Sequence, residues 1–233
     1  MTAEPSSGQQ DYDLFASQYD EAYKDPVSQW ENRRIARMIE RFAQGPLDEA
    51  TIYDLGCGTG LYFDLGLQAG FYVGLDVCPA MIEQALAKHA GDSRKFKIED
   101  FTEFKFKLNV EADLILGLFG SLSYSTQIKA ASILAGFAPN TQFFLMLFAD
   151  GKTGVHKRRD RALPDVLSIV RHFSFETASQ EFFACQELDI RGFNFCMELG
   201  QPMTIGRRIL NWLGEVFCPS RCRYLIVTGR TPA

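Results

Sequence analysis

The stretch TIYDLGCGTG at residues 51–60 decides the fold of this chain. A short apolar run there leads directly into three glycines at alternate positions, Gly56, Gly58 and Gly60, and a segment of helical spacing follows. Glycines let the backbone turn sharply and approach a ligand without a side chain in the way, and the amides at the start of the next helix can receive an anionic group. A glycine-rich turn between a strand and a helix can also be purely structural, so the loop alone does not establish a ligand site.

Acidic residues end the two strands expected after this loop. Asp76 follows the apolar run of residues 71–75, and Asp100 ends the next strand, with Phe101 directly after it. In a doubly wound sheet the ends of neighbouring strands meet at one edge, where a carboxylate can accept hydrogen bonds from both hydroxyls of a ribose. We therefore expect Asp76 beside a ribose and Asp100 beside an adenine amino group, with Phe101 offering a backbone amide and a ring to the purine.

These elements together resemble the S-adenosylmethionine (SAM)-binding motifs of class I methyltransferases: DLGCGTG, then GLD, then ED-F. By motif the resemblance covers about residues 50–149, and the order of elements extends it to the C-terminus. It implies that Asp54 and the glycines hold the methionine part of SAM, that Asp76 binds the ribose, and that Asp100 with Phe101 binds the adenine. The product it implies is S-adenosylhomocysteine. The cofactor contacts implied are Tyr19, Asp54, Gly56, Cys57, Gly58, Gly60, Asp76, Val77, Met81, Asp100, Phe101 and Leu118.

A nicotinamide or flavin dinucleotide is the main competing ligand for such a loop. Its fingerprint requires G-x-G-x-x-G, whereas the position three after Gly58 is Leu61. The third glycine falls one residue early, which argues against a dinucleotide.

The apolar pattern predicts an α/β fold. Short β-rich runs at about 51–55, 71–76, 95–99, 112–118 and 142–149 alternate with helical stretches, and two helices precede them. Pro79 is expected to open one helix, Gly70 to cap another, and the Ser125-Thr126 pair to cap a third. We expect a helical region from about 163 to 190, a strand introduced by Gly192, a helix near 203–217 and a last strand at 224–228. The expected architecture is a Rossmann-like, doubly wound, seven-stranded sheet, mostly parallel with a C-terminal antiparallel strand.

The domain organisation expected is one methyltransferase domain over residues 1–233. Within it we expect a disordered segment at 1–10, N-terminal helices and a candidate lid at 11–45, a SAM-binding core at 50–149, a substrate-side insert and helix at 150–190, and a strand-helix-strand unit at 191–233. The lid interpretation rests on Tyr19, which the resemblance places over the methionine end of SAM, although an aromatic residue on the packed face of an amphipathic helix would give the same pattern.

Composition and charge argue against several classes of binding partner. The net charge of −5 is opposite in sign to that of a protein that grips a phosphate backbone, so nucleic acid is disfavoured. No apolar window of transmembrane length and no signal pattern occurs, which favours a cytoplasmic protein without membrane insertion. The six cysteines include no CxxC pair and favour reduced thiols without a metal site, although Cys218 and Cys222 leave a disulfide or metal clip open. The oligomeric state is not predicted.

The sequence identifies the substrate-binding residues less clearly than the cofactor-binding ones. The loop at 119–124 lacks the Asn/Asp-Pro-Pro-Tyr/Phe sequence of amino-methylating enzymes that act on bases and glutamine. Ser121, Ser123 and Tyr124 could contact substrate or simply form a capped turn. A basic run could hold an anionic substrate group or form a solvated face; it consists of Lys152, His156, Lys157, Arg158, Arg159 and Arg161.

The catalytic candidates are His172, Tyr124 and Tyr19. His156 is a weaker candidate than His172, and His89 is expected to be structural. The function expected is methyl transfer to an oxygen or nitrogen of a small organic metabolite. The alternatives are a protein of this fold that binds SAM or a partner without turnover, a methyltransferase acting on a macromolecule, and an aminopropyl transferase resembling spermidine synthase.

Overall fold

The computed structural model describes residues 7–107, 109–194 and 204–232 of the 233-residue chain. Its main sheet has seven strands in the order β3-β2-β1-β4-β5-β9-β8. The strands are β1 (Thr51–Leu55), β2 (Phe71–Asp76), β3 (Arg94–Ile98), β4 (Leu114–Gly117), β5 (Gln142–Phe148), β8 (Gln186–Phe193) and β9 (Tyr224–Arg230). Strands β1 to β5 pair in parallel, and β9 runs antiparallel to both β5 and β8. The predicted seven-stranded, mostly parallel sheet is confirmed.

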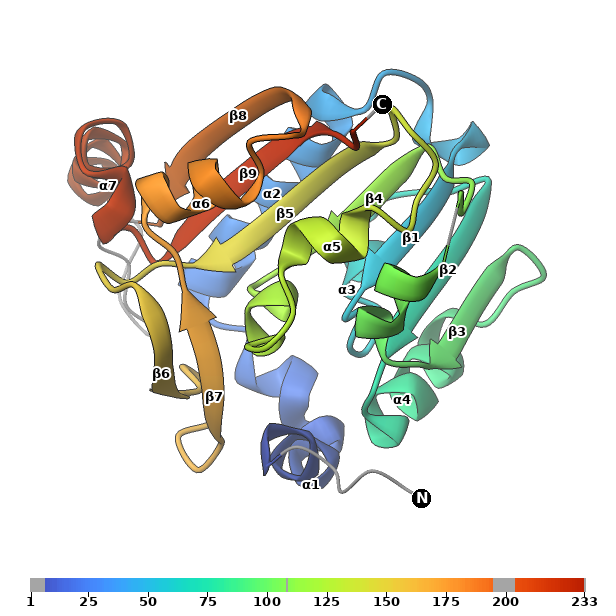
Figure 1. Cartoon of the computed structure of the whole chain (residues 1–233). Helices are drawn as coiled ribbons and strands as arrows, with labels where there is room; N and C mark the ends of the chain where they lie inside the picture. The colour runs from blue at the N-terminus through green and yellow to red at the C-terminus, as the bar shows by residue number, and fades with distance from the viewer. Residues whose placement is uncertain (1–6, 108, 195–203, 233) are drawn as a thin grey trace.

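Helices cover both faces of this sheet (Figure 1). The α-helices are α1 (Ser7–Ala22), α2 (Pro26–Phe42), α3 (Leu61–Asp64), α4 (Pro79–His89), α5 (Ala130–Leu134), α6 (Phe175–Glu181) and α7 (Ile205–Phe217), and the 3-10 helices are η1 (Leu47–Glu49), η2 (Phe101–Phe106), η3 (Ser121–Tyr124) and η4 (Pro219–Arg221). One buried cluster packs α2, α3 and α4 on the face that carries Ile52 and Tyr72. The other packs η2, α5 and α6 on the face that carries Val73 and Leu75. Burial on both faces explains the nearly continuous apolar strands.

The two predicted N-terminal helices are present. The Asp25 side chain accepts hydrogen bonds from the amides of Val27 and Ser28, and Pro26 occupies the first helical turn, so α2 has a well-formed start. Helix α1 begins at Ser7, which shortens the segment expected to be disordered: residues 7–10 are helical, and residues 1–6 lie outside the described part of the chain.

The largest correction concerns residues 150–190. The helical region expected from about 163 to 190 is present only at α6. Before it, β6 (Gly154–Arg159) and β7 (Leu167–His172) form a separate two-stranded antiparallel ladder, and after it β8 begins at Gln186. Burial alternates along β7, with Ser168, Val170 and His172 inside. A short apolar run such as LSIVRH fits either period, and only its pairing with β6 selects the strand.

Three local boundaries also differ from expectation. Gly192 lies near the end of β8 rather than before a strand, and a Cβ there would come 2.6 Å from the Cys222 sulfur, so close packing explains this glycine. The strand expected after it extends into residues 195–203, outside the described residues.

Gly70 caps no helix, since α3 ends at Asp64. Its amide instead donates to the carbonyls of Leu47 and Ala50 just before β2. Helix α5 starts at Ala130, with Lys129 and not the Ser125-Thr126 pair at its N-cap.

Candidate functional site

The glycine loop turns sharply between β1 and α3. Gly56, Gly58 and Gly60 have φ of 80°, 54° and 89°, in the left-handed region that favours glycine. The amides of Gly56 and Cys57 donate to the Leu75 carbonyl over 2.7 and 2.9 Å, which holds the loop against the end of β2. A Cβ added to Gly58 would meet nothing within 4 Å. The loop therefore presents backbone to open space at its centre, as a ligand cradle requires.

Asp76 connects this loop to the end of β2. Its Oδ2 accepts from the Gly58 amide and its Oδ1 from the Cys78 amide, both over 2.9 Å. These bonds fix the orientation of the Asp76 carboxylate against the glycine loop. As the sequence predicts, Asp76 and the glycine loop lie together at one edge of the sheet.

Asp54 carries an unsatisfied buried oxygen. The residue is 2% exposed, its Oδ2 accepts a 2.8 Å hydrogen bond from Tyr72, and its Oδ1 has no hydrogen-bond partner among the described residues. The pKa of Asp54 is raised to about 6, because burial and, less strongly, the nearby Asp76 charge raise it by more than the Tyr72 hydrogen bond lowers it. An acceptor left unpaired in the interior is costly, and a ligand's cationic donor group would satisfy it. The residues present thus fit a ligand that carries an ammonium group and vicinal hydroxyls.

The other expected cofactor residues fall into two groups. Cys57, Met81 and Leu118 are buried at 4%, 4% and 6% exposure and line the region as packed side chains. Gly60 lies against His89, whose ring would be 2.6 Å from an added Cβ, and His89 also contacts Asp64 at 3.0 Å. These contacts agree with a structural part for His89. Val77 is half-buried in the turn between β2 and α4.

Asp100 and Phe101 lie at the same edge but present different groups. Asp100 is exposed and caps η2 by accepting the Thr102 amide over 2.8 Å. The Phe101 side chain is 8% exposed and belongs to the core beneath the sheet. The structure thus assigns the Phe101 ring mainly to packing.

Helix α1 lies across the glycine loop, beyond the edge of the sheet where the parallel strands end (Figure 1). Asp20 accepts from the Thr59 hydroxyl over 2.6 Å and pairs with Lys88 over 2.7 Å, which ties α1 to the loop and to α4. Ala16 packs with Cys78 and Met81, and Tyr12 and Tyr19 border that cluster. The helix expected to be a lid is therefore positioned over the predicted cofactor site.

Tyrosines from distant segments meet Asp160 beside α1. Tyr23 donates to both Asp160 oxygens over 2.8 Å, and Tyr12 reaches Asp160 over 3.0 Å and the Tyr124 hydroxyl over 2.8 Å. Tyr19 lies between the Tyr12 and Tyr23 rings, with ring centroids 6.0 and 5.0 Å away. Burial raises the pKa of Tyr124 to about 12 and that of Tyr19 well above its usual value. Both phenols are consequently protonated at neutral pH and act as hydrogen-bonding groups rather than as bases.

The basic run divides into buried and exposed members. Arg158 packs over the Phe148 ring at 3.9 Å and contacts Asp150 at 3.3 Å. Arg161 forms a two-pronged ion pair with Glu31 at 3.0 and 2.8 Å. The remaining members, Lys152, His156, Lys157 and Arg159, are exposed. The two arginines nearest the site are paired with carboxylates of this chain, which weakens the expectation of an anion-binding run.

His172 is the best placed of the histidines for chemistry. It is 2% exposed, its ring lies 5.4 Å from that of His156, and neither ring nitrogen forms a hydrogen bond within the described structure. Its Nε2 lies 3.6 Å from Asp150 Oδ2. Burial opposes ionisation of Asp150, but His172 and Arg158 outweigh it and the pKa of that carboxyl lies below its usual value.

Glu31 and Asp160 were not singled out from the sequence. Glu31 occupies one position on an amphipathic helix and Asp160 is an acid inside a basic run, so each has the appearance of an ordinary surface charge. No signal in the sequence distinguishes either acid from a surface charge, because their partners, two tyrosines for Asp160 and Arg161 for Glu31, come from distant segments. Ser121 was considered, and its buried hydroxyl lies close to Gly56 without a hydrogen-bond partner in the described residues.

The comparisons with known proteins follow this geometry. Residues 52–138 match a family described as a methyltransferase domain. These residues form a methyltransferase domain. SAM is the cofactor of this family, and the matched residues include the glycine loop, Asp54, Asp76 and Asp100. No curated protein matches the chain significantly.

Solved structures share the fold at low sequence identity. A protein from Thermotoga maritima described as a possible histamine N-methyltransferase is 11% identical with a TM-score of 0.63, over 96% of this chain and 99% of that one. DhpI in a complex with SAM and HEP is 18% identical with a TM-score of 0.59, over 96% of each chain. The CurJ carbon methyltransferase is 12% identical with a TM-score of 0.60, over 97% of this chain and 59% of that one. These neighbours establish the fold of the methyltransferase domain, and their acceptor atoms differ.

Among the described residues, no group of three or more His, Cys, Asp or Glu side chains is arranged to hold a metal ion. Within the same part of the chain, no helix has both the length and the apolar composition needed to cross a bilayer. Cys218 and Cys222 form no disulfide with each other.

Proposed function

We propose that this protein binds SAM at the glycine loop and transfers its methyl group to an oxygen or nitrogen of a small organic metabolite. The observation that supports this most is the unpaired, buried Oδ1 of Asp54 beside a glycine loop that faces open space. In this proposal Asp54 receives the ammonium group of the methionine part, directly or through water, and the glycine amides lie along it. Asp76 accepts the ribose hydroxyls, and Asp100 with the Phe101 amide holds the adenine.

The remaining cofactor residues serve as walls of the same site. Cys57, Val77, Met81 and Leu118 supply apolar surface, and Tyr19 contributes a ring and a protonated hydroxyl above it. When bound, SAM supplies a methyl group activated by its sulfonium, and S-adenosylhomocysteine is a good leaving group. The task of the protein is then to hold the acceptor in line, and such positioning can be worth roughly 7–11 kcal/mol.

We further propose that α1 acts as a lid and that His172, oriented by Asp150, accepts a proton when the acceptor arrives protonated. Tyr124 is better suited to hydrogen-bonding the substrate, because its raised pKa disfavours the phenolate. Turnover of His172→Gln tests the base: the rate of methyl transfer should fall while SAM binding is unchanged, and an unchanged rate would remove His172 from the mechanism.

The acidic net charge supports a small, uncharged or cationic acceptor over nucleic acid, and a cytoplasmic setting remains part of the proposal. The main alternative is a protein that binds SAM without transferring its methyl group. The histidine beside Asp150 favours the catalytic form, because an unsatisfied buried imidazole has no evident part in a purely structural domain.

Calorimetric titration of SAM and S-adenosylhomocysteine tests the site directly. Asp76→Ala removes the two proposed ribose bonds and the acceptor for the Gly58 amide, and bonds to a charged group contribute about 1.5–3 kcal/mol each. We expect the affinity for both ligands to fall at least about 100-fold. Asp92→Ala, at an exposed acid in the turn before β3, is the matched control and should bind normally.

Either half of the proposal can fail separately. Absence of SAM binding by the intact protein, or equal binding by the Asp76 variant, would refute the site. Binding without S-adenosylhomocysteine release across oxygen and nitrogen acceptors would support the alternative without turnover.

A further inference from the structure

Helix α7 presents an apolar face to solvent. It follows β8 in the chain and lies at the outer edge of the sheet (Figure 1). Six of its large apolar residues are more than half exposed, between 52% and 76%: Ile205, Ile209, Leu210, Trp212, Val216 and Phe217. At 100° per residue they occupy one continuous stripe, which we call the α7 face. Contiguous exposed apolar surface of this extent on a soluble protein marks an interaction site.

Polar contacts hold α7 in this orientation. Asn211 and Gly214 are buried on the inner side, and the Glu215 carboxylate forms a two-pronged ion pair with Arg34 of α2 at 2.8 and 2.7 Å. Glu215 also accepts from Asn211 Nδ2 over 2.6 Å and from the Asn194 amide over 2.7 Å. Rotating the helix to bury its apolar stripe would break these charged, partly buried bonds. The outward direction of the α7 face is therefore built into the fold.

The size of the α7 face matches one side of a dimer. Side chains of these types at these exposures present on the order of 800 Å² in total, close to the area that each partner contributes to a standard interface. The stripe runs from Ile205 to Phe217, so an antiparallel pair of α7 helices centred midway between these residues would bring Ile209 opposite Leu213 of the second copy. Gly206 has nothing within 4 Å of its Cβ position and lies within the stripe, where it lets helices approach closely.

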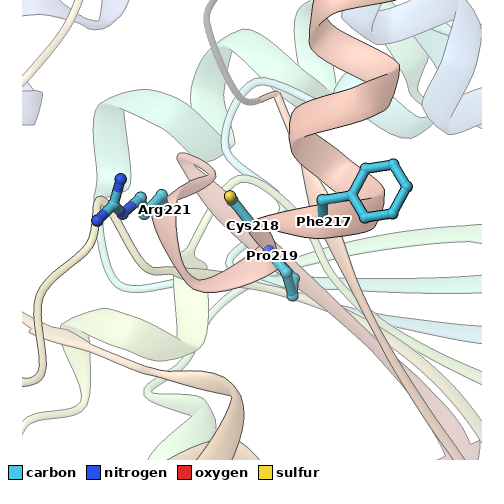
Figure 2. Close-up of a pocket in the computed structure, with 4 residues that line it drawn as sticks. All are labelled: Phe217, Cys218, Pro219 and Arg221. Atoms are coloured by element: carbon cyan, nitrogen blue, oxygen red, sulfur yellow. The ribbon is translucent and has the colours of Figure 1, made fainter.

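A hollow at the end of α7 continues the α7 face. It is shallow and open to solvent, and it is lined by Phe217, Cys218, Pro219 and Arg221. Figure 2 shows the Phe217 ring extending from the helix end, with Arg221 on the turn that follows. In the antiparallel arrangement the exposed Ile205 of the second copy comes to this end of the helix. A projecting residue at one end and a hollow at the other give the self-complementarity that a two-fold interface requires.

A lipid surface fits the α7 face less well. Interfacial helices combine an apolar face with a basic polar face directed at anionic head groups. In α7 the basic residues are only Arg207, which is half-buried, and Arg208, which is exposed, while Glu215 is paired with Arg34 of α2. The whole chain carries a net charge of −5. We propose that the α7 face is the two-fold interface of a homodimer formed through antiparallel packing of α7 against α7 of a second copy.

Sedimentation equilibrium up to about 100 μM tests this proposal, since interfaces of this area have dissociation constants of micromolar or tighter. We expect twice the monomer mass of 26.3 kDa for the intact chain. Trp212→Glu and Ile209→Glu, which place a charge at exposed positions of the α7 face, should give monomers with unchanged circular dichroism. Phe183→Glu changes a residue that is 82% exposed outside that face and should remain dimeric.

Three results would overturn the proposal. The intact chain could stay monomeric over the whole concentration range, or both α7 variants could remain dimeric. A monomer that cosediments with vesicles of phosphatidylserine and phosphatidylcholine, and loses this in Trp212→Glu, would instead assign the face to a lipid surface.

Discussion

The two sides of the proposed active site are built in different ways. The cofactor side comes from one continuous stretch, in which Asp54, Asp76 and Asp100 each lie at or beside the end of successive parallel strands. The substrate side gathers Tyr12, Tyr124 and Asp160 from segments more than a hundred residues apart at the extremes. Local order in the sequence thus determines the first, and tertiary packing determines the second.

The two sides also differ in how their buried charges are satisfied. Asp54 keeps an oxygen without a hydrogen-bond partner in the described structure, which destabilises the protein but leaves that oxygen ready for a ligand. Across the site, Glu31 and Arg161 satisfy each other, and Asp160 accepts from two tyrosines and from the amides of Ala162 and Leu163. We therefore expect substitutions to stabilise the cofactor side and to destabilise the substrate side.

The largest effect should come from Glu31→Ala. Glu31 and Arg161 have side chains 0% and 8% exposed, and removing one partner of a buried pair typically costs about 3–5 kcal/mol because the other charge is left unpaired. Urea denaturation should show a loss of this size. Glu21→Ala breaks an exposed pair with Lys24 and should leave stability nearly unchanged, because solvent screens such pairs. Similar losses in both variants would contradict the comparison.

A smaller effect of opposite sign is expected for Asp54→Asn in the absence of SAM. The pKa of Asp54 is about 6 in the folded protein, above an unfolded value of about 3.9, and two pKa units correspond to about 2–3 kcal/mol. Because the folded chain holds this proton more tightly, the native protein is favoured below about pH 4 and loses that advantage as the pH rises to about 6. The variant has no such loss.

Thermal unfolding at several pH values measures this. Asp54→Asn should be more stable than the parent at pH 8 by about 2 kcal/mol, and the difference should vanish toward pH 4. Its SAM affinity should fall in parallel. Destabilisation at pH 8 would mean that the Asp54 carboxylate is satisfied in solution in a way that the structure does not contain.

The smallest effect is expected for Tyr23→Phe. Tyr23 directly follows α1, and this change removes its hydrogen bond to Asp160 while keeping the ring. The loss should be about 1–2 kcal/mol and should appear locally, as faster amide exchange in α1 with α4 unchanged. Tyr53→Phe, where the hydroxyl has no hydrogen bond among the described residues, is the matched control. Equal exchange in α1 for both variants would show that Asp160 does not hold the helix.

The sequence was sufficient for the parallel half of the sheet for two reasons. Strands β2, β4 and β5 are largely apolar, and β1, β2 and β3 end at or just before a glycine or an acid at the same edge. The sequence failed at residues 154–172, where the exposed β6 and the alternating β7 are strands only because they pair with each other. Short runs of that composition satisfy more than one period, so the pairing partner carries the missing information.

By itself, then, the sequence determined the order of the elements, the cofactor loop and the acids that follow it, since these depend on local conformation and on the common direction of parallel strands. Only the tertiary structure decided which charges are paired, which oxygen of Asp54 is left without a partner, and which face of α7 meets solvent. The reason is physical: burial and hydrogen bonding are properties of neighbours brought together by the fold, and a residue such as Glu31 carries no mark in the sequence of the arginine it will meet.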